Sequence, residues 1–178
     1  MSYRYTENDR EKFEVPAEEL APWLIGKVLC HRAGDGFIIR GRIRETGAYR
    51  ESDETADANR GAGGHTQLLS GGHLHYRSGP RGRLDIVAGT KGTVASVLIR
   101  AIDPYFSQSG KGQPANAVFA MDLDKVPGLD GLDLLVNETV WLEDDGIGVE
   151  LGVPQPREGI LGNEPLRFWA KCFTFTCK

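Results

Sequence analysis

The chain has 178 residues, of which 40% are hydrophobic and 26% charged, a composition typical of one soluble globular domain. Its net charge of −4 argues against a uniformly basic nucleic-acid binder. No apolar run reaches the roughly 18 residues of a membrane span, and the polar N-terminus lacks a signal-peptide pattern. We therefore expect a single domain over residues 1–178, cytoplasmic rather than secreted, with no membrane partner.

Charge is distributed unevenly along the chain. Residues 73–100 hold five arginine or lysine residues and one aspartate, a local net charge of +4. Residues 121–158 hold ten acidic and two basic residues, a local net charge of −8. Such a separation allows one positive face on an acidic protein, although solvated surfaces without a partner would give the same counts.

The first half of the chain predicts an arm, a helix and a hairpin. Residues 1–14 are polar and predict a flexible arm. A helix is expected from Pro16, since proline and the two following glutamates suit a first helical turn, and it ends at Gly26. Residues 27–32 and 37–49 predict two strands joined by a turn.

The second half predicts mainly strands. Three strand candidates are separated by glycine-rich turns, and the most apolar of them is expected near the centre of the sheet. A helical turn is expected at 117–121 and further strands near 139–143 and 165–170. The three candidates are residues 73–78, 83–88 and 93–101.

Five segments, in this order and at this spacing, resemble the alkyladenine (3-methyladenine) DNA glycosylase family. The resemblance extends from about residue 14 to about residue 171. It implies a mixed α/β (α+β) fold, in which one domain is built around a curved, mostly antiparallel sheet. The segments are Leu20–Leu29, Gly41–Tyr49, Val97–Pro104, Val140–Asp144 and Pro165–Trp169.

The resemblance also implies a function. Members of this family excise alkylated or deaminated purines from duplex DNA in base-excision repair, as monofunctional glycosylases without a metal or other cofactor. The damaged base is flipped into a pocket because its N-glycosidic bond is out of reach inside the stack. For this chain we accordingly expect duplex DNA with a damaged base as partner, no cofactor, no metal and a monomeric state.

The catalytic positions depart from the family pattern. The family strand reads Glu-Thr-Glu-Ala-Tyr and its second glutamate activates the water, but Gly47 stands at that position. Glycine has no side chain that could act as a general base. The base-stacking tyrosine of the family hairpin corresponds to His75, its DNA-wedging tyrosine to Ser78, and a pocket asparagine to Asp85.

Other residues are candidates for the missing role. Glu45 lies on the same strand face as Gly47, about 6.5 Å along the strand, and is the first alternative base; pairing with a nearby arginine is the competing interpretation. Glu51, Asp53 and Asp57 in the following loop are weaker alternatives.

The substrate-binding candidates are expected to lie together on one face of three adjacent strands. Tyr49 and Arg100 keep the family's pocket positions. His73 and His75 share a strand face near Asp85, an arrangement suited to acid–base work, to metal ligation or simply to a polar pocket.

Compared with the family pattern, the hairpin carries additional cations. These favour a role on DNA, because phosphate contacts supply most of the non-specific affinity. The alternatives are a non-catalytic DNA- or nucleobase-binding protein and an enzyme rebuilt for a small purine-like or anionic substrate. The nucleic-acid-contact candidates are Arg77, Ser78, Arg81, Arg83 and Lys91.

Overall fold

The computed structural model describes residues 1–53, 68–105, 115–157 and 163–174. Within these residues the fold is dominated by nine strands in one curled sheet, and every pairing between them is antiparallel. The strands are β1 (Tyr3–Arg4), β2 (Val28–Arg32), β3 (Ile38–Tyr49), β4 (Leu74–Arg77), β5 (Arg83–Ala88), β6 (Ala95–Pro104), β7 (Val140–Asp144), β8 (Val149–Leu151) and β9 (Arg167–Phe173).

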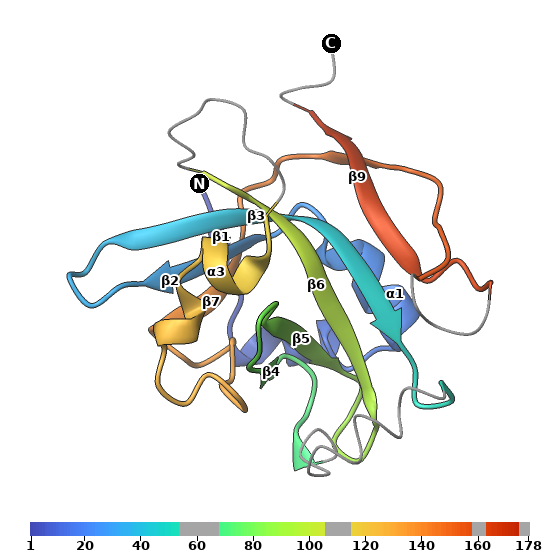
Figure 1. Ribbon diagram of the computed structural model, residues 1–178, viewed down its shortest axis with the longest axis horizontal. Coiled ribbons are helices and arrows are strands. Elements are labelled where there is room, and N and C mark those ends of the chain that lie inside the picture. The colour runs from blue at the N-terminus through green and yellow to red at the C-terminus, as the bar shows by residue number, and fades with distance from the viewer. Residues whose placement is uncertain (54–67, 106–114, 158–162, 175–178) are drawn as a thin grey trace.

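The long strand β3 organises the sheet. The main strand order is β1-β7-β2-β3-β6-β5-β4, and β9 pairs with β3 and β8 outside this path. On one side β3 pairs with β2 and then β9; on the other it pairs with β6 along most of its length. Figure 1 shows β3 and β6 crossing the middle of the molecule side by side. Residues near the end of β3 therefore lie between β6 and β9.

Helices are few and short in the described part of the chain. Helix α1 packs against β3 and β6: it buries Leu20 and Leu24 completely, and the Thr46 hydroxyl donates a 2.8 Å hydrogen bond to the Ala21 carbonyl. The helix thereby covers the apolar face of β3 and leaves the opposite face for polar side chains. The helices are η1 (Glu7–Lys12), α1 (Ala17–Leu24), α3 (Ala117–Ala120) and η3 (Leu123–Lys125).

Residues 1–14, for which the sequence predicts a flexible arm, pack against the domain instead. Strand β1 pairs with β7, and the Tyr5 and Phe13 side chains are almost fully buried. Both rings contact Trp23 edge-to-face, at centroid distances of 5.2 and 5.4 Å. The segment is held by aromatic contacts with α1, which local sequence patterns do not reveal.

The predicted fold class is confirmed: this is one mixed α/β domain with a curved antiparallel sheet and few helices (Figure 1). The predicted hairpin is present as β2 and β3. Among the described residues, no helix combines the length and apolar character needed to span a membrane.

Candidate active site

The register of four strands places the candidate residues on one face of the sheet. His75 pairs with Asp85, Asp85 with Leu98, and Leu98 with Gly47. Directly paired residues of antiparallel strands share a face, so this row crosses the sheet from β4 to β3. The residues two positions away from this row in each strand lie on the same face, and they include Glu45, Tyr49, Arg83 and Arg100.

At Gly47 this face has room for a side chain. A Cβ atom built there would lie 3.5 Å from Arg100 Cδ and 3.6 Å from Tyr49 Cε2, which are ordinary van der Waals distances. Its φ lies outside the left-handed region that favours glycine. Neither close packing nor backbone conformation therefore requires glycine at this position.

Glu45, the nearest carboxylate along the strand, is held by two arginines. Its Oε1 atom accepts hydrogen bonds from Arg100 Nε at 2.8 Å and Arg167 Nε at 2.6 Å. The side chain retains 19% exposure. This oxygen is therefore engaged by guanidinium groups, in agreement with the ion-pair interpretation.

Guanidinium groups also cover Tyr49, the residue expected to stack on a flipped base. The carbon atoms Cζ of Arg83 and Arg157 lie 4.4 and 4.7 Å from the ring centroid, and the residue is only 5% exposed. Cation–π contacts of this kind are attractive when desolvated. A base that stacks on this ring must displace a guanidinium group or stack on it.

Two buried carboxylates hold these arginines in place. Asp85 is fully buried. It accepts two 2.8 Å hydrogen bonds from Arg83 and one hydrogen bond from the Ser96 hydroxyl. Asp53 accepts a 2.8 Å hydrogen bond from Arg157. Burial tends to raise the pKa of Asp53, but hydrogen bonds from Arg157 and Arg50 outweigh it and hold this pKa below its ordinary value.

Of the weaker candidate bases, Asp53 is thus committed to an ion pair. Glu51 is exposed and lies at the rim of a separate hollow beside β6. Asp57 lies outside the described residues.

The two histidines face other partners than Asp85. His75 is 4% exposed and its Nδ1 donates to Asp130 Oδ1 at 3.0 Å, while its Nε2 is buried without a hydrogen-bond partner among the described residues. His73 Nδ1 donates to the Ser70 carbonyl at 2.9 Å.

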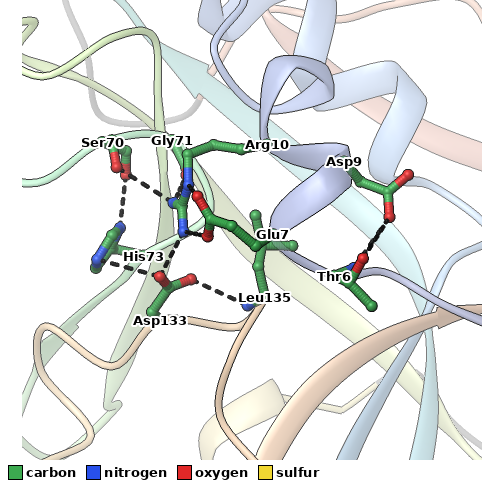
Figure 2. Close-up of polar contacts among 9 residues, drawn as sticks. All are labelled: Thr6, Glu7, Asp9, Arg10, Ser70, Gly71, His73, Asp133 and Leu135. Carbon is green, nitrogen blue, oxygen red and sulfur yellow. Dashed lines mark hydrogen bonds and ion pairs between the residues drawn. The ribbon is translucent and has the colours of Figure 1, made fainter.

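Figure 2 shows that His73 belongs to a network centred on Arg10. Its Nε2 lies 3.6 Å from Asp133 Oδ2, which also accepts from Arg10. The structure therefore brings Tyr49, Asp85 and Arg100 together and gives the two histidines separate carboxylate partners. In the described part of the chain, no three His, Cys, Asp or Glu side chains are grouped to hold a metal ion.

The nucleic-acid-contact candidates divide between two ends of the sheet. Arg77, Ser78, Arg81 and Arg83 lie at the turn between β4 and β5. Lys91 lies in the turn after β5, at the opposite end of that strand, about 17 Å away for a six-residue strand. The hairpin turn and Lys91 therefore do not form one continuous basic patch.

A cleft of about 590 Å³ opens between the hairpin turn and β9. We call it the arginine cleft, because four of its nine lining residues are arginines. Arg167 reaches it from β9, directly opposite Gly47 in the sheet register. The lining consists of Glu45, Arg81, Gly82, Arg83, Leu98, Ile99, Arg100, Asn116 and Arg167.

Three residues of this site escape sequence reasoning: Asn116, Arg157 and Arg167. Asn116 Nδ2 donates to the carbonyl oxygens of Arg81 and Gly82, at 2.6 and 3.1 Å, and so holds the hairpin turn against α3. Strand alternation would have placed Arg167 on one of two faces, but only its pairing with Gly47 shows which one. No local sequence pattern marks Arg157.

Known proteins match most of this chain. The family model for methylpurine-DNA glycosylase matches residues 11–172. One relative is a protein of Chlorobaculum parvum that carries the provisional name 3-methyladenine DNA glycosylase. It is 33% identical, over 92% of this chain and 86% of its own length. A protein of Chlorobaculum tepidum with the same name is 30% identical, over 89% and 83%.

A DNA-3-methyladenine glycosylase of Rattus norvegicus is 28% identical, over 75% of this chain and 50% of its own length. The family match covers β3, β6 and all but the last residue of β9, the strands that carry Gly47, Tyr49, Arg100 and Arg167. The names of family and relatives support a role of this fold in DNA repair, with DNA as the substrate. The chain belongs to the methylpurine-DNA glycosylase family.

Proposed function

We propose that this protein binds duplex DNA at a damaged purine. With its natural residue Gly47, it removes the base only slowly. Family membership supports DNA as the substrate. The damaged base would enter from the polar face of the sheet, between Tyr49 and the arginine cleft. Catalysis would be limited there by the absence of a general base.

The proposal rests on Gly47, which has no side chain to act as a base, and on Glu45, whose carboxylate is already hydrogen-bonded to two arginines. Hydrolysis of an N-glycosidic bond needs a water molecule at C1′ of the sugar, and a positioned base accelerates such a step by about 10²–10⁴. The family resemblance places this base at position 47. The neighbouring carboxylate of Glu45 instead accepts two hydrogen bonds from arginines.

Recognition of a flipped base remains compatible with this face. Arg83 covers the Tyr49 ring at 4.4 Å, so a base would stack on this planar guanidinium group or on the ring after displacing it. Bases stack on both kinds of surface. Arg77 and Arg81 at the hairpin turn would neutralise DNA phosphates.

Two measurements on the same duplexes test the proposal. Oligonucleotide duplexes with one hypoxanthine, ethenoadenine or 3-methyladenine are compared with an undamaged duplex, first by binding titration and then by single-turnover excision. We expect tighter binding to at least one damaged duplex and excision that is very slow or undetectable. Equal affinity for damaged and undamaged duplexes contradicts the recognition, and rapid excision by the unmodified protein contradicts the assigned loss of the base.

A variant and its control locate the site. Tyr49→Ala removes a stacking surface worth about 1–3 kcal/mol per base, so the preference for the damaged duplex is expected to disappear. Arg32→Ala, on the exposed end of β2 outside the cleft lining, removes one charge and should keep that preference. An unchanged preference in Tyr49→Ala would place recognition elsewhere.

A further inference from the structure

We propose that Arg83 selects the base that this protein binds, and that it favours a flipped purine with a hydrogen-bond acceptor at position 6 over one without it. The inference rests on the proposed function, because it concerns how a flipped base is recognised. From the sequence, Arg83 is a candidate for a DNA contact at the hairpin turn. Its guanidinium group instead lies over the Tyr49 ring and lines the arginine cleft.

Arg83 contacts both the open cleft and the Tyr49 ring. Its guanidinium carbon lies 4.4 Å from the ring centroid, and its side chain retains 28% exposure. Tyr49 is only 5% exposed and is not among the residues that line the cleft. A base that enters the cleft therefore meets Arg83 while Tyr49 stays covered.

A buried carboxylate holds Arg83 in this position. Asp85 accepts hydrogen bonds from Arg83 Nε and Nη2 at 2.8 Å each, a paired contact that orients the guanidinium plane. Asp85 is fully buried and also accepts from the Ser96 hydroxyl at 3.0 Å. Displacement of Arg83 would leave this charge buried without its partner, which is strongly unfavourable. The base is therefore expected to contact Arg83 itself rather than replace it on the ring.

The remaining N–H groups of Arg83 can contact the base. A guanidinium group carries five N–H donors and no acceptor, and Asp85 uses two of these donors. With the Tyr49 hydroxyl counted as a further partner, two donors are left. Arg83 makes no other hydrogen bond among the residues that the structure describes. This side of the site can therefore satisfy acceptors on a base but not donors.

Hypoxanthine, the deaminated form of adenine, has the matching edge. Like guanine it carries acceptors at O6 and N7, the pair that arginine recognises most often in DNA complexes. Adenine and 3-methyladenine carry an amino group at position 6, and a guanidinium group has no acceptor for it. Guanine shares the edge with hypoxanthine, but its stable pair with cytosine opposes flipping, which costs least for a mismatched or damaged base. Arg83 therefore favours a deaminated purine over a 3-methylated one.

The cleft has the size and an apolar surface for a purine beside Arg83. Its volume of about 590 Å³ lies within the roughly 300–1,000 Å³ typical of small-molecule sites. Leu98 lines it and pairs with Asp85 on one side and Gly47 on the other, so it lies on the same sheet face as Arg83. A purine ring held by Arg83 at its edge can rest on this leucine.

Fluorescence titrations of one duplex sequence test the proposal. The variable position, opposite thymine, holds hypoxanthine, 3-methyladenine or unsubstituted purine, which lacks the oxygen at position 6. We expect the hypoxanthine duplex to bind at least about tenfold more tightly than the purine duplex, the discrimination typical of an arginine that reads O6 and N7. Equal affinities for these two duplexes, or tightest binding of the 3-methyladenine duplex, would overturn the inference.

Two variants assign the selection to Arg83. Arg83→Met combined with Asp85→Asn removes the donors without leaving a buried charge unpaired, and should bring the hypoxanthine-to-purine affinity ratio close to one. The cost of flipping each base belongs to the DNA and cancels when this ratio is compared between proteins. Arg83→Lys keeps a positive charge beside Asp85 but loses the planar fork, so it should lower the ratio even if the double variant does not fold. An unchanged ratio in either folded variant contradicts the role of Arg83.

Arg81→Met is the matched control within the same cleft. Arg81 also lines the cleft, but it is exposed and is assigned to DNA phosphates. Loss of a phosphate contact weakens binding about equally for all sequences, so the affinity ratio should stay as in the natural protein. If Arg81→Met lowers the ratio as much as the Arg83 variants do, the selection is not a property of Arg83 and the inference fails.

An undamaged duplex with adenine at the variable position keeps the two proposals apart. A preference for damaged over undamaged DNA that depends neither on the 6-oxygen nor on Arg83 supports the proposed function and overturns this inference. Equal binding of the damaged and undamaged duplexes overturns the proposed function, and the inference with it.

Discussion

Gly47 leaves a space on the polar sheet face that a longer side chain can fill. We expect Gly47→Glu to raise the single-turnover excision rate on a damaged duplex by about 10²–10⁴, the usual contribution of a general base. The distances of 3.5 and 3.6 Å from a Cβ atom at this position to Arg100 and Tyr49 are ordinary contacts, so the first atom of a side chain fits without a shift of the backbone.

Gly47→Gln is the matched control, because it has nearly the same shape and cannot accept a proton as a carboxylate does. Its excision rate should stay at the level of the natural protein. Equal rates for the two variants, whether both high or both low, would show that the carboxylate at position 47 is not what this site lacks.

At the scale of single elements, the 3₁₀ helix η1 is the anchor of the N-terminal segment. Arg10 donates to the Gly71 carbonyl at 2.8 Å, to Asp133 at 2.5 Å and to Glu7 (Figure 2). These contacts join η1 to the loop that precedes β4 and to the segment between η3 and β7. We expect Arg10→Met to lower the free energy of unfolding by about 2 kcal/mol, the value for hydrogen bonds to charged groups.

Urea unfolding of Arg10→Met beside Arg32→Met checks this expectation. Arg32 is exposed at the end of β2, and among the described residues its side chain contacts only the Trp141 ring, at 5.7 Å. Such a contact is worth about 0.5–1 kcal/mol, so replacement of Arg32 should change the unfolding free energy by less than about 1 kcal/mol. A loss of similar size in both variants would mean that the network around Arg10 contributes nothing specific.

Asp9 in the same element makes stability depend on pH. Burial tends to raise the pKa of Asp9, but hydrogen bonds from Lys12, the Thr6 backbone and Tyr3 outweigh it and lower this pKa to about 2. Since the folded-state pKa lies below the unfolded value of about 3.9, the carboxylate stabilises the protein above pH 4. This contribution is lost as the pH falls toward 2.

Asp9→Asn should therefore be less stable than the natural protein at pH 7, and the difference should shrink steadily between about pH 4 and pH 2. Urea unfolding across this range measures it. A difference that is independent of pH would show that the amide disturbs packing and that ionisation of Asp9 has no part in stability.

At the scale of the whole molecule, the two basic turns lie at opposite ends of β5, so the salt dependence of binding distinguishes which end of the sheet faces DNA. Each phosphate contact contributes about one unit to the slope of log binding constant against log salt. We expect Arg81→Ala to reduce this slope by about 1 and Lys91→Ala to leave it unchanged, because Lys91 lies at the opposite end of β5. Fluorescence titrations at several salt concentrations measure both slopes.

The reverse result, with the slope reduced only by Lys91→Ala, would place the DNA across the other end of the strands. Equal reductions would mean that the duplex spans both turns.

The sequence predicted most of the scaffold and little of the side-chain pairing. Residues 83–88 and 37–49 have apolar and polar residues in patterns that the structure confirms as β5 and β3. Strands β1 and β8 were missed, because two or three residues are too few to show a period. The partners of Tyr49 and Glu45 depend on strand register and on loops far along the chain, which single-sequence patterns do not specify.

The pairing of β1 with β7 has a consequence for handling the protein. Tyr3 and Arg4 satisfy the backbone of a strand that would otherwise form an open edge of the sheet. Open edges invite pairing with a second molecule. Removal of the first few residues, or a bulky N-terminal fusion that keeps them from docking, would therefore favour edge-to-edge association and precipitation at high concentration.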